Sequence, residues 1–312
     1  MIIEVLSKII SESLLSLYPI FIKKINIPFG LHLWCRFFIY VLVSFFFIDW
    51  KFVFEHLLST NGILLSFVTI LHIFFSYRGF QLLESGIAYV CFYTYPIMIL
   101  LLSGEKMNFI TILFLFIAIF GIYLLFSSSF ISFSFVSFSP DFERKDEKKE
   151  KDDKETKKNL ILGFIMVFLA AFTEAAIYFV VRRIPTNNNW NHLFISYFFG
   201  AIAFSIYYLF IGATKNNISI ALLIPLLIAA LLINFIIGLF GYYLRFYSIT
   251  RLPTKIYALL SYVGIIMAFI YGVVFNREKI TLLKIIGSIF IVVPVYWISS
   301  SLDYNLSKNI AK

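Results

Sequence analysis

Charged residues are scarce in this 312-residue chain, where only 14% of the positions are Asp, Glu, Lys or Arg. Soluble globular domains are about 25% charged, so the composition excludes an ordinary water-soluble protein. Cysteine is rarer still. Cys35 and Cys91 both fall inside apolar stretches, which predicts small buried side chains rather than a disulfide. The four histidines show no ligand spacing, so we expect no metal site.

Several functional signatures are also missing. No Gly-x-x-x-x-Gly-Lys loop is present to hold a nucleotide phosphate, and we expect no cofactor. Much of the basic character behind the net charge of +9 lies in short loops and at the ends of apolar runs, and no basic, aromatic-interleaved segment is present to bind nucleic acid. A cleavable signal peptide is not predicted, because the first apolar run carries Glu4, Lys8 and Glu12.

Apolar residues, by contrast, make up 61% of the chain, and the mean hydropathy is +0.92. Apolar runs of about 17–25 residues, the length that crosses a bilayer, recur throughout. The runs are continuous rather than alternating, so they predict an all-α integral membrane protein of the cell membrane and not a β-barrel. The ten predicted spans are 5–22, 30–48, 60–80, 86–103, 110–127, 160–182, 191–212, 220–245, 256–276 and 281–300.

One polar segment divides these spans into two sets of five. The stretch SPDFERKDEKKEKDDKETKKN, residues 139–159, mixes acids and bases with almost no apolar residues. Such composition predicts a disordered linker. We therefore divide the chain into a first five-helix unit, 1–127, a charged linker, 128–159, and a second five-helix unit, 160–312.

The two halves contain similar short motifs in the same order. IKKI (22–25) ends the first span and VRRI (181–184) ends the sixth, and YRGFQLL (77–83) resembles LRFYSIT (244–250). SGEKMNF (103–109) and NREKITL (276–282) end the fourth and ninth spans. Because five is an odd number, two such halves must have opposite orientations in the membrane. The predicted fold is therefore ten helices in two inverted repeats, a design common among secondary transporters.

Together these features resemble the EamA-like, ten-span branch of the drug/metabolite transporter superfamily. The resemblance rests on the five-plus-five spans, on the Glu-Lys pair that closes the fourth and ninth, and on Arg36 in LWCRFFIY early in the second span. It covers nearly the whole chain outside 127–159. It implies a ten-helix carrier with a central cavity that works by alternating access, uses an ion gradient or exchange rather than ATP, and often exports amino acids or related metabolites.

Ionisable residues inside predicted spans are candidate site residues, because a buried charge costs roughly 2.5–3.5 kcal/mol on insertion scales. Glu12, Arg36 and Glu174 are the three clearest cases. Aligning the IKKI and VRRI motifs puts Glu12 and Glu174 about one helical turn apart in depth, an arrangement that a carrier coupled to a proton or cation could use. Arg36 could contact an anionic group, because guanidinium binds carboxylates through two hydrogen bonds.

A purely structural explanation stays open for each of these charges. Glu174, Tyr178 and Arg182 share one helix face, so Glu174 could pair with Arg182, or with Arg36 from another helix. Glu12 is near the start of its span, where its carboxylate could extend to the interface.

Aromatic and amide side chains are the second group of candidates. Tyrosine hydroxyls inside a bilayer need partners and could line a substrate cavity, where the rings could also bind a cation. The candidates are Tyr178 and the residues of two repeat-equivalent spans, Tyr89, Tyr93, Tyr95, Tyr257 and Tyr262. Asn234 is predicted to form a hydrogen bond between helices, with cavity lining as the alternative.

Charged residues at span ends receive a different interpretation. Glu105 and Glu278 stand next to lysines, and Arg78 and Arg245 close the third and eighth predicted spans. We expect all four to anchor helix ends at the interface rather than to bind substrate.

The predicted function is secondary active transport of a small polar metabolite, with an amino-acid or amine exporter as the leading candidate. A carrier of nucleobases, sugars or other metabolites is the alternative within transport. A membrane enzyme would need a cluster of His, Asp or Ser at the membrane surface, and none is apparent. A non-transporting scaffold or receptor is a further class, but such a protein would have little reason to retain charged residues inside its spans. The expected partners are the lipid bilayer, a small-molecule substrate and a coupling proton or cation, and a homodimer is left open.

Overall fold

The computed structural model describes residues 2–83, 85–104, 147–210 and 220–277, together with parts of 109–127 and 281–297. Over these residues the chain is helical and contains no strand. The helices are α1 (Ile2–Leu15), α2 (Tyr18–Lys24), α3 (Phe29–Ser44), α4 (Trp50–Leu57), α5 (Thr60–Leu82), α6 (Ser85–Phe92), α7 (Tyr95–Leu102), α9 (Glu147–Arg182), α10 (Asn189–Phe210), α11 (Ile220–Ile233), a π-helix (Asn234–Leu239), α12 (Phe240–Arg251), α13 (Thr254–Ser261) and α14 (Val263–Asn276).

Five helical segments of the described chain are long and apolar enough to cross a membrane: Ile2–Lys24, Thr60–Leu82, Lys158–Arg182, Leu223–Arg251 and Thr254–Phe275. Shorter apolar helices cover Phe29–Ser44, Ala88–Leu102 and Ile112–Gly121. The all-α membrane fold predicted from the sequence is thus confirmed. The count of ten spans and the inverted repeat remain predictions.

Three of the predicted spans are each built from two consecutive helices. α2 and α7 each have a proline in their first turn, Pro19 and Pro96. Proline fits the first turn of a helix, but inside a continuous helix its ring would clash with the preceding turn. The chain therefore restarts at these two positions. α13 and α14 meet at Tyr262 without a proline.

α9 extends further into the charged segment than predicted. It begins at Glu147, whereas the sequence predicts a disordered linker up to residue 159. Glu and Lys, which dominate this stretch, are strong helix formers, and the apolar helix that follows supplies a nucleus for extending it. Residues 128–146 lie outside the described part of the chain.

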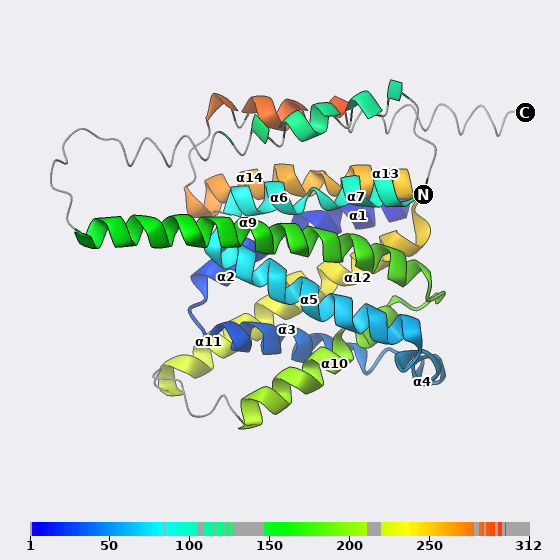
Figure 1. The fold of residues 1–312 in the computed structure, drawn as a ribbon. Helices are drawn as coiled ribbons and strands as arrows, with labels where there is room; N and C mark the ends of the chain where they lie inside the picture. The colour runs from blue at the N-terminus through cyan, green and yellow to red at the C-terminus, as the bar shows by residue number, and fades with distance from the viewer. Residues whose placement is uncertain are drawn as a thin grey trace, which may run out of the picture.

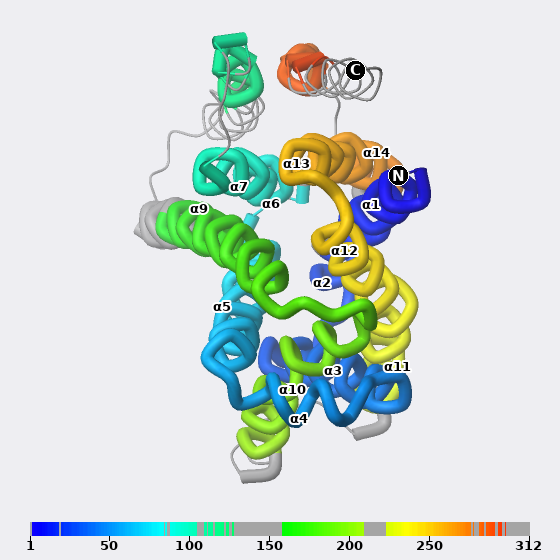
Figure 2. Tube along the Cα trace, turned by 90° about the vertical axis from the view of Figure 1, so that its right-hand side faces the viewer, coloured from blue at the N-terminus to red at the C-terminus, as the bar shows by residue number. Residues whose placement is uncertain are grey.

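The helices run roughly parallel and antiparallel to one another and surround a central core, as the end-on view shows (Figure 2). α5 packs along α9, α1 along α12, and α3 along α10, so the first and second halves of the chain interleave. Figure 1 shows the α2–α3 connection at the left end of the molecule and the α9–α10 connection at the right end.

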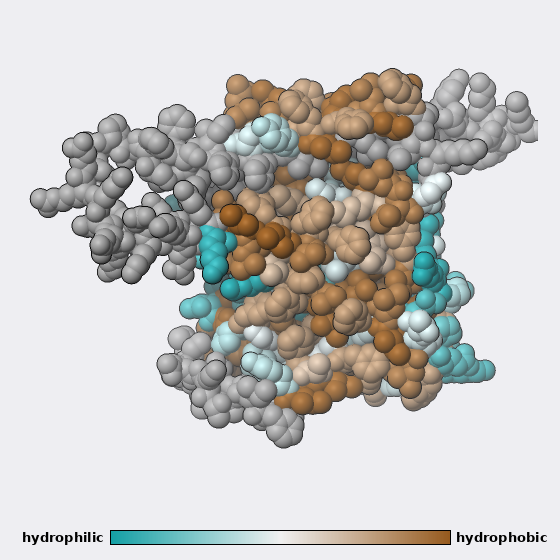
Figure 3. Space-filling model, in the orientation of Figure 1, coloured by the Kyte–Doolittle hydropathy of each residue, from teal (hydrophilic) through white to brown (hydrophobic). Residues whose placement is uncertain are grey.

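The surface and the interior have the polarity expected in a bilayer. On α9, Phe168 and Phe172 are 55% and 54% exposed, whereas Glu174 is 1% exposed. Figure 3 shows a broad apolar band with polar residues at its left and right ends. An apolar surface around buried charges is the reverse of a soluble protein and suits a surrounding of lipid.

Candidate functional site

A buried ion pair on α1 is the starting point of the site. Lys8 and Glu12 are four residues apart, so the helix places them on one face, and both are 0% exposed. The Lys8 ammonium donates a hydrogen bond to Glu12 Oε1. Its nitrogen also lies 3.6 Å from the centroid of the Tyr257 ring, within the range of a cation–π interaction.

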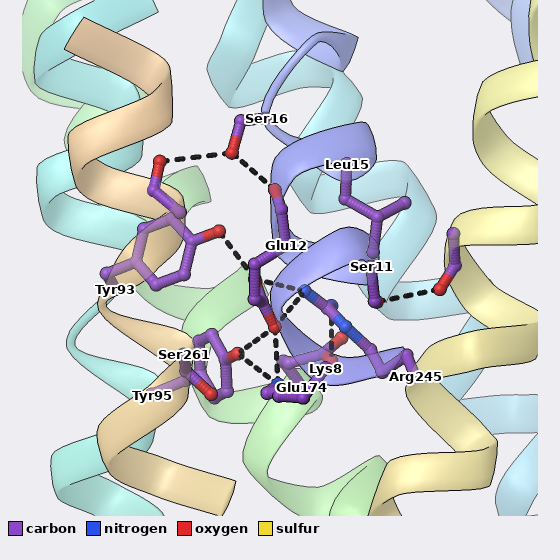
Figure 4. Close-up of polar contacts among 12 residues, drawn as sticks. Lys8, Ser11, Glu12, Leu15, Ser16, Tyr93, Tyr95, Glu174, Arg245 and Ser261 are labelled. Atoms are coloured by element: carbon purple, nitrogen blue, oxygen red, sulfur yellow. Dashed lines mark hydrogen bonds and ion pairs between the residues drawn. The ribbon is translucent and has the colours of Figure 1, made fainter. Parts of the chain in front are cut away.

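Arg245 of α12 joins this pair to α9. Its Nη2 donates to Glu12 Oε2 at 2.9 Å, and its Nη1 donates to Glu174 Oε1 at 2.6 Å (Figure 4). Arg245 is itself 1% exposed. We call Lys8, Glu12, Glu174 and Arg245 the charge tetrad. It contains two acids and two bases from three helices, so its formal charges cancel.

Neutral polar groups surround the acids of the tetrad. The Tyr93 hydroxyl donates to Glu12 Oε2 at 2.6 Å, and the Tyr95 hydroxyl donates to Glu12 Oε1 at 3.2 Å. His72 of α5 brings Nε2 within 3.3 Å of Glu174 Oε2. These contacts replace part of the hydration that the carboxylates would have in water, which is required when charges are buried.

Arg36 of α3 occupies a second buried position with a different environment. Its guanidinium lies 4.6–5.9 Å from the centroids of five tyrosine rings, and its Nη2 donates to the Tyr197 hydroxyl at 3.1 Å. The five rings belong to Tyr18, Tyr40, Tyr77, Tyr197 and Tyr242, which we call the tyrosine cage. Among the described residues, no carboxylate forms an ion pair with Arg36.

A small cavity of about 20 Å³ separates Arg36 from the tetrad. It is lined by Leu15, Tyr18, Arg36, His72, Ser76, Phe80, Tyr89, Phe92, Tyr93, Tyr242 and Arg245. This volume suffices for about one water molecule. The described centre of the molecule is therefore closed around a small cavity that two arginines line together with aromatic and aliphatic side chains.

Most of the site residues predicted from the sequence lie near the tetrad or the small cavity. Glu12, Glu174, Tyr93, Tyr95 and Tyr257 come together around the tetrad, and Tyr89 lines the cavity and donates to the carbonyl of Leu15. The ring of Tyr178 packs on the ring of Tyr257 with 4.9 Å between centroids. Tyr262 is buried at the α13–α14 junction and does not line this cavity.

The Asn234 amide contacts other helices. Its Oδ1 accepts from the Tyr18 and Tyr77 hydroxyls at 3.1 and 3.2 Å. Asn234 opens the π-helix, whose wider turn changes the facing of the residues that follow. The helix–helix contact expected from the sequence is present.

The structure corrects one expectation about the charges and decides two alternatives that the sequence leaves open. Arg245 is not an interfacial anchor, because it is buried and paired with both acids. Glu174 pairs with Arg245 and not with Arg182 or Arg36. The Glu12 carboxylate does not extend to the interface, since it is 0% exposed. Each of these three side chains is held in the interior by an ion pair with a residue on another helix.

The remaining predicted anchors lie away from the site. Arg78 lies near the end of α5, half-buried, with its Nη1 3.5 Å from Gln81 Oε1. Glu105 and Glu278 lie outside the described residues.

Sequence reasoning missed Lys8, His72 and the tyrosine cage as site residues. Lys8 stands four residues before Glu12 in an apolar run, a spacing that predicts a buried pair once Glu12 is placed inside a span. Tyrosines at the centre of apolar spans are also visible in the sequence. Their convergence on Arg36 from five different helices is not, because it depends on how those helices pack.

A wide vestibule opens at one end of the molecule. It has a volume of about 960 Å³, and its polar lining residues include Asp49, Thr186, Asn187, Asn188, Asn191 and Arg251. Arg182, another lining residue, donates through Nε to the Ile249 carbonyl at 2.9 Å and through Nη2 to the Leu252 carbonyl. Arg182 thus ties the end of α9 to the end of α12.

An equivalent contact exists in the first half of the chain. Lys23, in the last turn of α2, donates to the carbonyl of Leu83, the residue that caps α5. Leu252 caps α12 in the same way. We call Lys23–Leu83 and Arg182–Leu252 the two end contacts; Figure 1 places the helix ends that they join at opposite ends of the molecule.

Two histidines form a second matching pair. His32 and His192 are each the fourth residue of their helices, α3 and α10. His32 Nε2 lies 2.9 Å from the Ile25 carbonyl, and His192 Nε2 lies 2.8 Å from the Ile184 carbonyl. In each half, one histidine therefore closes the turn that follows the basic motif.

Fold and site together define a class: a multi-pass integral membrane protein with charges from several helices buried at its centre. Residues 161–300 match the model of the EamA-like transporter family, part of the drug/metabolite transporter superfamily. The family predicted from the sequence is thereby confirmed, with the match lying in the second half of the chain. It indicates a membrane transporter, and a transporter family rather than an enzyme family.

Solved structures add a likeness of fold over the whole chain. One, titled only "Crystal structure of protein", has a TM-score of 0.60 and 14% sequence identity, and the alignment covers 94% of this chain and 96% of that one. At this identity the likeness shows the fold alone. A search of the curated proteins finds no match.

Proposed function

We propose that this chain is a secondary active transporter that moves small polar metabolites by alternating access, with ten spans in two inverted five-helix repeats. The observation that carries the proposal is the charge tetrad. It gathers two acids and two bases, each at most 1% exposed, from helices of both halves of the chain. Burying ions costs several kcal/mol each, so their retention inside apolar spans indicates a functional demand.

The matched contacts of the two halves support an inverted repeat. α6 and α13 have the same length of eight residues, and each is followed by a short break and a second helix. The end contacts join the first and third predicted spans of each half, α2 to α5 and α9 to α12, each through a base in a last turn and the carbonyl of a capping leucine. Equivalent contacts at opposite ends are expected when one five-helix unit is repeated upside down.

These end contacts also suit alternating access. Both are formed in this structure, and the cavity between them is small, as expected of an occluded state. Opening toward one side would then break one end contact while the other persists. We propose that substrate approaches the central cavity through the vestibule, from the end of the molecule where Arg182 lies.

We propose Glu174 and Glu12 as the coupling residues, since protonation or a bound cation would change the charge balance around Arg245. Amino acids are the leading substrate candidates. Their carboxylate and ammonium groups both find partners among guanidinium, carboxylate and aromatic groups here.

The test is uptake and counterflow of a metabolite panel in proteoliposomes. The intact protein is compared with Glu174→Gln, which keeps the shape but removes the charge, and with Glu55→Gln, which alters an exposed carboxylate on α4. We expect gradient-dependent flux of at least one compound, lowered about tenfold or more only by Glu174→Gln, since charge-assisted hydrogen bonds contribute about 1.5–3 kcal/mol.

Two results would count against the proposal at different levels. Absence of gradient-dependent flux for every compound would remove the transport function. Equal flux in the intact protein and Glu174→Gln from about pH 5 to about pH 8, the range where buried carboxylates commonly exchange protons, would remove Glu174 from coupling.

A further inference from the structure

Arg36 carries the one charge at the described centre of the molecule that lacks a partner of opposite sign. The tetrad is balanced internally, with Lys8 and Arg245 matching Glu12 and Glu174. Arg36 is 2% exposed and contacts tyrosines instead of acids. Cation–π contacts contribute about 2 kcal/mol when desolvated, less than the several kcal/mol that burial of an ion costs. A formal charge of one unit is thus left uncompensated.

The cavity next to Arg36 presents the chemistry of an anion site. Arg36 and Arg245 both line it, with His72 and the phenol rings of Tyr18, Tyr89, Tyr93 and Tyr242, whereas none of its lining residues is a carboxylate. The Nε of Arg36 is buried and has no hydrogen-bond partner in the described structure. Because Arg245 is already paired with two acids, Arg36 supplies the uncompensated positive charge at this cavity, which favours an anion over a cation.

We propose that this cavity binds the carboxylate of a small metabolite carrying a single carboxylate group, with Arg36 as the residue that recognises it. The inference rests on the proposed transport function and specifies its substrate class. Guanidinium offers parallel N–H donors that match the two oxygens of a carboxylate, and the Nε–H of Arg36 is such a donor without a partner among the described residues. Binding gives Arg36 the counter-ion that the described residues do not supply.

The charge balance at Arg36 favours a ligand with one negative charge over dianions, amines and sugars. A phosphate dianion would leave one negative charge uncompensated in a low-dielectric interior, at a large desolvation cost. A plain amine or a sugar would leave Arg36 unpaired. An amino acid is a zwitterion, so its carboxylate would balance Arg36 while its ammonium group would need a partner of its own, such as a carboxylate or an aromatic ring.

The size of the cavity sets the choice of probe. A volume of about 20 Å³ in the closed state admits little more than a water molecule, so larger substrates require the helices to separate. Formate is the smallest carboxylate, and formamide is its neutral counterpart of nearly equal shape. The pair therefore separates the effect of charge from that of size.

The experiment measures thermal stability of the purified full-length protein with sodium formate, with sodium chloride at equal ionic strength, and with formamide. A ligand that binds only the folded state raises the melting temperature in proportion to its occupancy. We expect formate to stabilise the protein and formamide to have no such effect. Arg36→Gln is expected to weaken formate binding about tenfold or more, while Arg78→Gln, on the neighbouring α5 but outside the cavity, leaves it unchanged.

Equal stabilisation by formate and chloride, or by formate and formamide, would overturn the proposal. So would full formate binding in Arg36→Gln. If Arg36→Gln does not fold, Tyr197→Phe serves instead, because it removes the hydroxyl that holds Nη2. We expect this variant to bind formate more weakly, and unchanged binding would count against the inference.

A transport arm separates this inference from the proposed function. Proteoliposomes are assayed with acetate, alanine, ethylamine and a sugar. Flux of ethylamine or sugar alone would keep the carrier and overturn the carboxylate class. Formate binding that depends on Arg36, with no flux of any compound, would keep the binding site and overturn the carrier.

Discussion

Lys8 and Glu12 illustrate at the scale of single residues why buried charges must be balanced as a set. Glu12 accepts from Lys8, Arg245, Tyr93 and Tyr95, so removing any one donor leaves the others to compensate a full negative charge. Loss of one member of a buried ion pair typically costs about 3–5 kcal/mol, because its partner stays buried and unpaired.

We predict that Lys8→Met lowers the free energy of unfolding by about 3–5 kcal/mol. The double variant Lys8→Met with Glu12→Gln should recover part of this loss, because Arg245 and Glu174 then remain as one balanced pair. Unfolding in detergent, followed by circular dichroism, measures both. Strictly additive losses would show that Lys8 and Glu12 do not act as a pair.

A glycine beside the tyrosine cage gives a second prediction at this scale. A Cβ on Gly238 would collide with the hydroxyls of Tyr18 and Tyr40, whereas a Cβ on Gly241 would approach the Leu15 side chain less closely, at 2.8 Å. Gly238→Ala should therefore cost about 1–3 kcal/mol through overpacking, and Gly241→Ala less. Thermal unfolding of the two variants side by side compares these costs, and a larger loss in Gly241→Ala would contradict the prediction.

At the scale of elements, the end contacts decide how the helices close the molecule. Each depends on one long basic side chain that reaches a carbonyl left free at the end of another helix. The last carbonyls of a helix have no partner within it and carry partial negative charge, so they favour cations. The same kind of contact, between a basic side chain and a carbonyl at a helix end, therefore occurs at both ends of the molecule.

We predict that Arg182→Met and Lys23→Met each remove one end contact and so open the molecule at opposite ends. The reporter is Ser76→Cys, at the cavity lining, in a background with Cys35→Ser and Cys91→Ser. Arg182→Met should speed labelling of this cysteine by an impermeant thiol reagent added on the side of the vestibule, and Lys23→Met should speed it from the other side. Faster labelling from the same side in both variants would refute the assignment.

At the scale of the whole molecule, the inverted repeat predicts the sidedness of two exposed basic residues. Lys24 and Arg183 follow the residues of the end contacts in the first and second halves, and both side chains are exposed. In single-cysteine variants, Lys24→Cys and Arg183→Cys should react with impermeant reagents from opposite sides of sealed vesicles. Reaction of both from one side would exclude the inverted arrangement.

The sequence predicted the helices better than the site. The third predicted span, 60–80, matches α5, and the ninth, 256–276, matches α13 and α14 within two residues at either end. Hydropathy is a local property that each segment expresses on its own, so it transfers directly from sequence to helix. The breaks before Pro19 and Pro96 have the same local origin.

The site was predicted in part. Glu12 and Glu174 stood out because a carboxylate inside an apolar run is costly wherever the run packs. Arg245 did not, since its position at the end of its predicted span suggested an anchor, whereas α12 continues to Arg251. Its location follows from α12 lying against α1 and near α9, which no local pattern records.

The sequence by itself determined that this chain is an α-helical membrane protein with few charges, some of them inside its spans. The short motifs and the pattern of apolar spans, which are both readable from the sequence, also pointed to the family. Only the tertiary structure decided which charges compensate one another, because ion pairing depends on distances between helices far apart in the chain. It paired Glu174 with Arg245 instead of Arg182, and it placed Arg36 among tyrosines with no acid beside it in the described part of the chain.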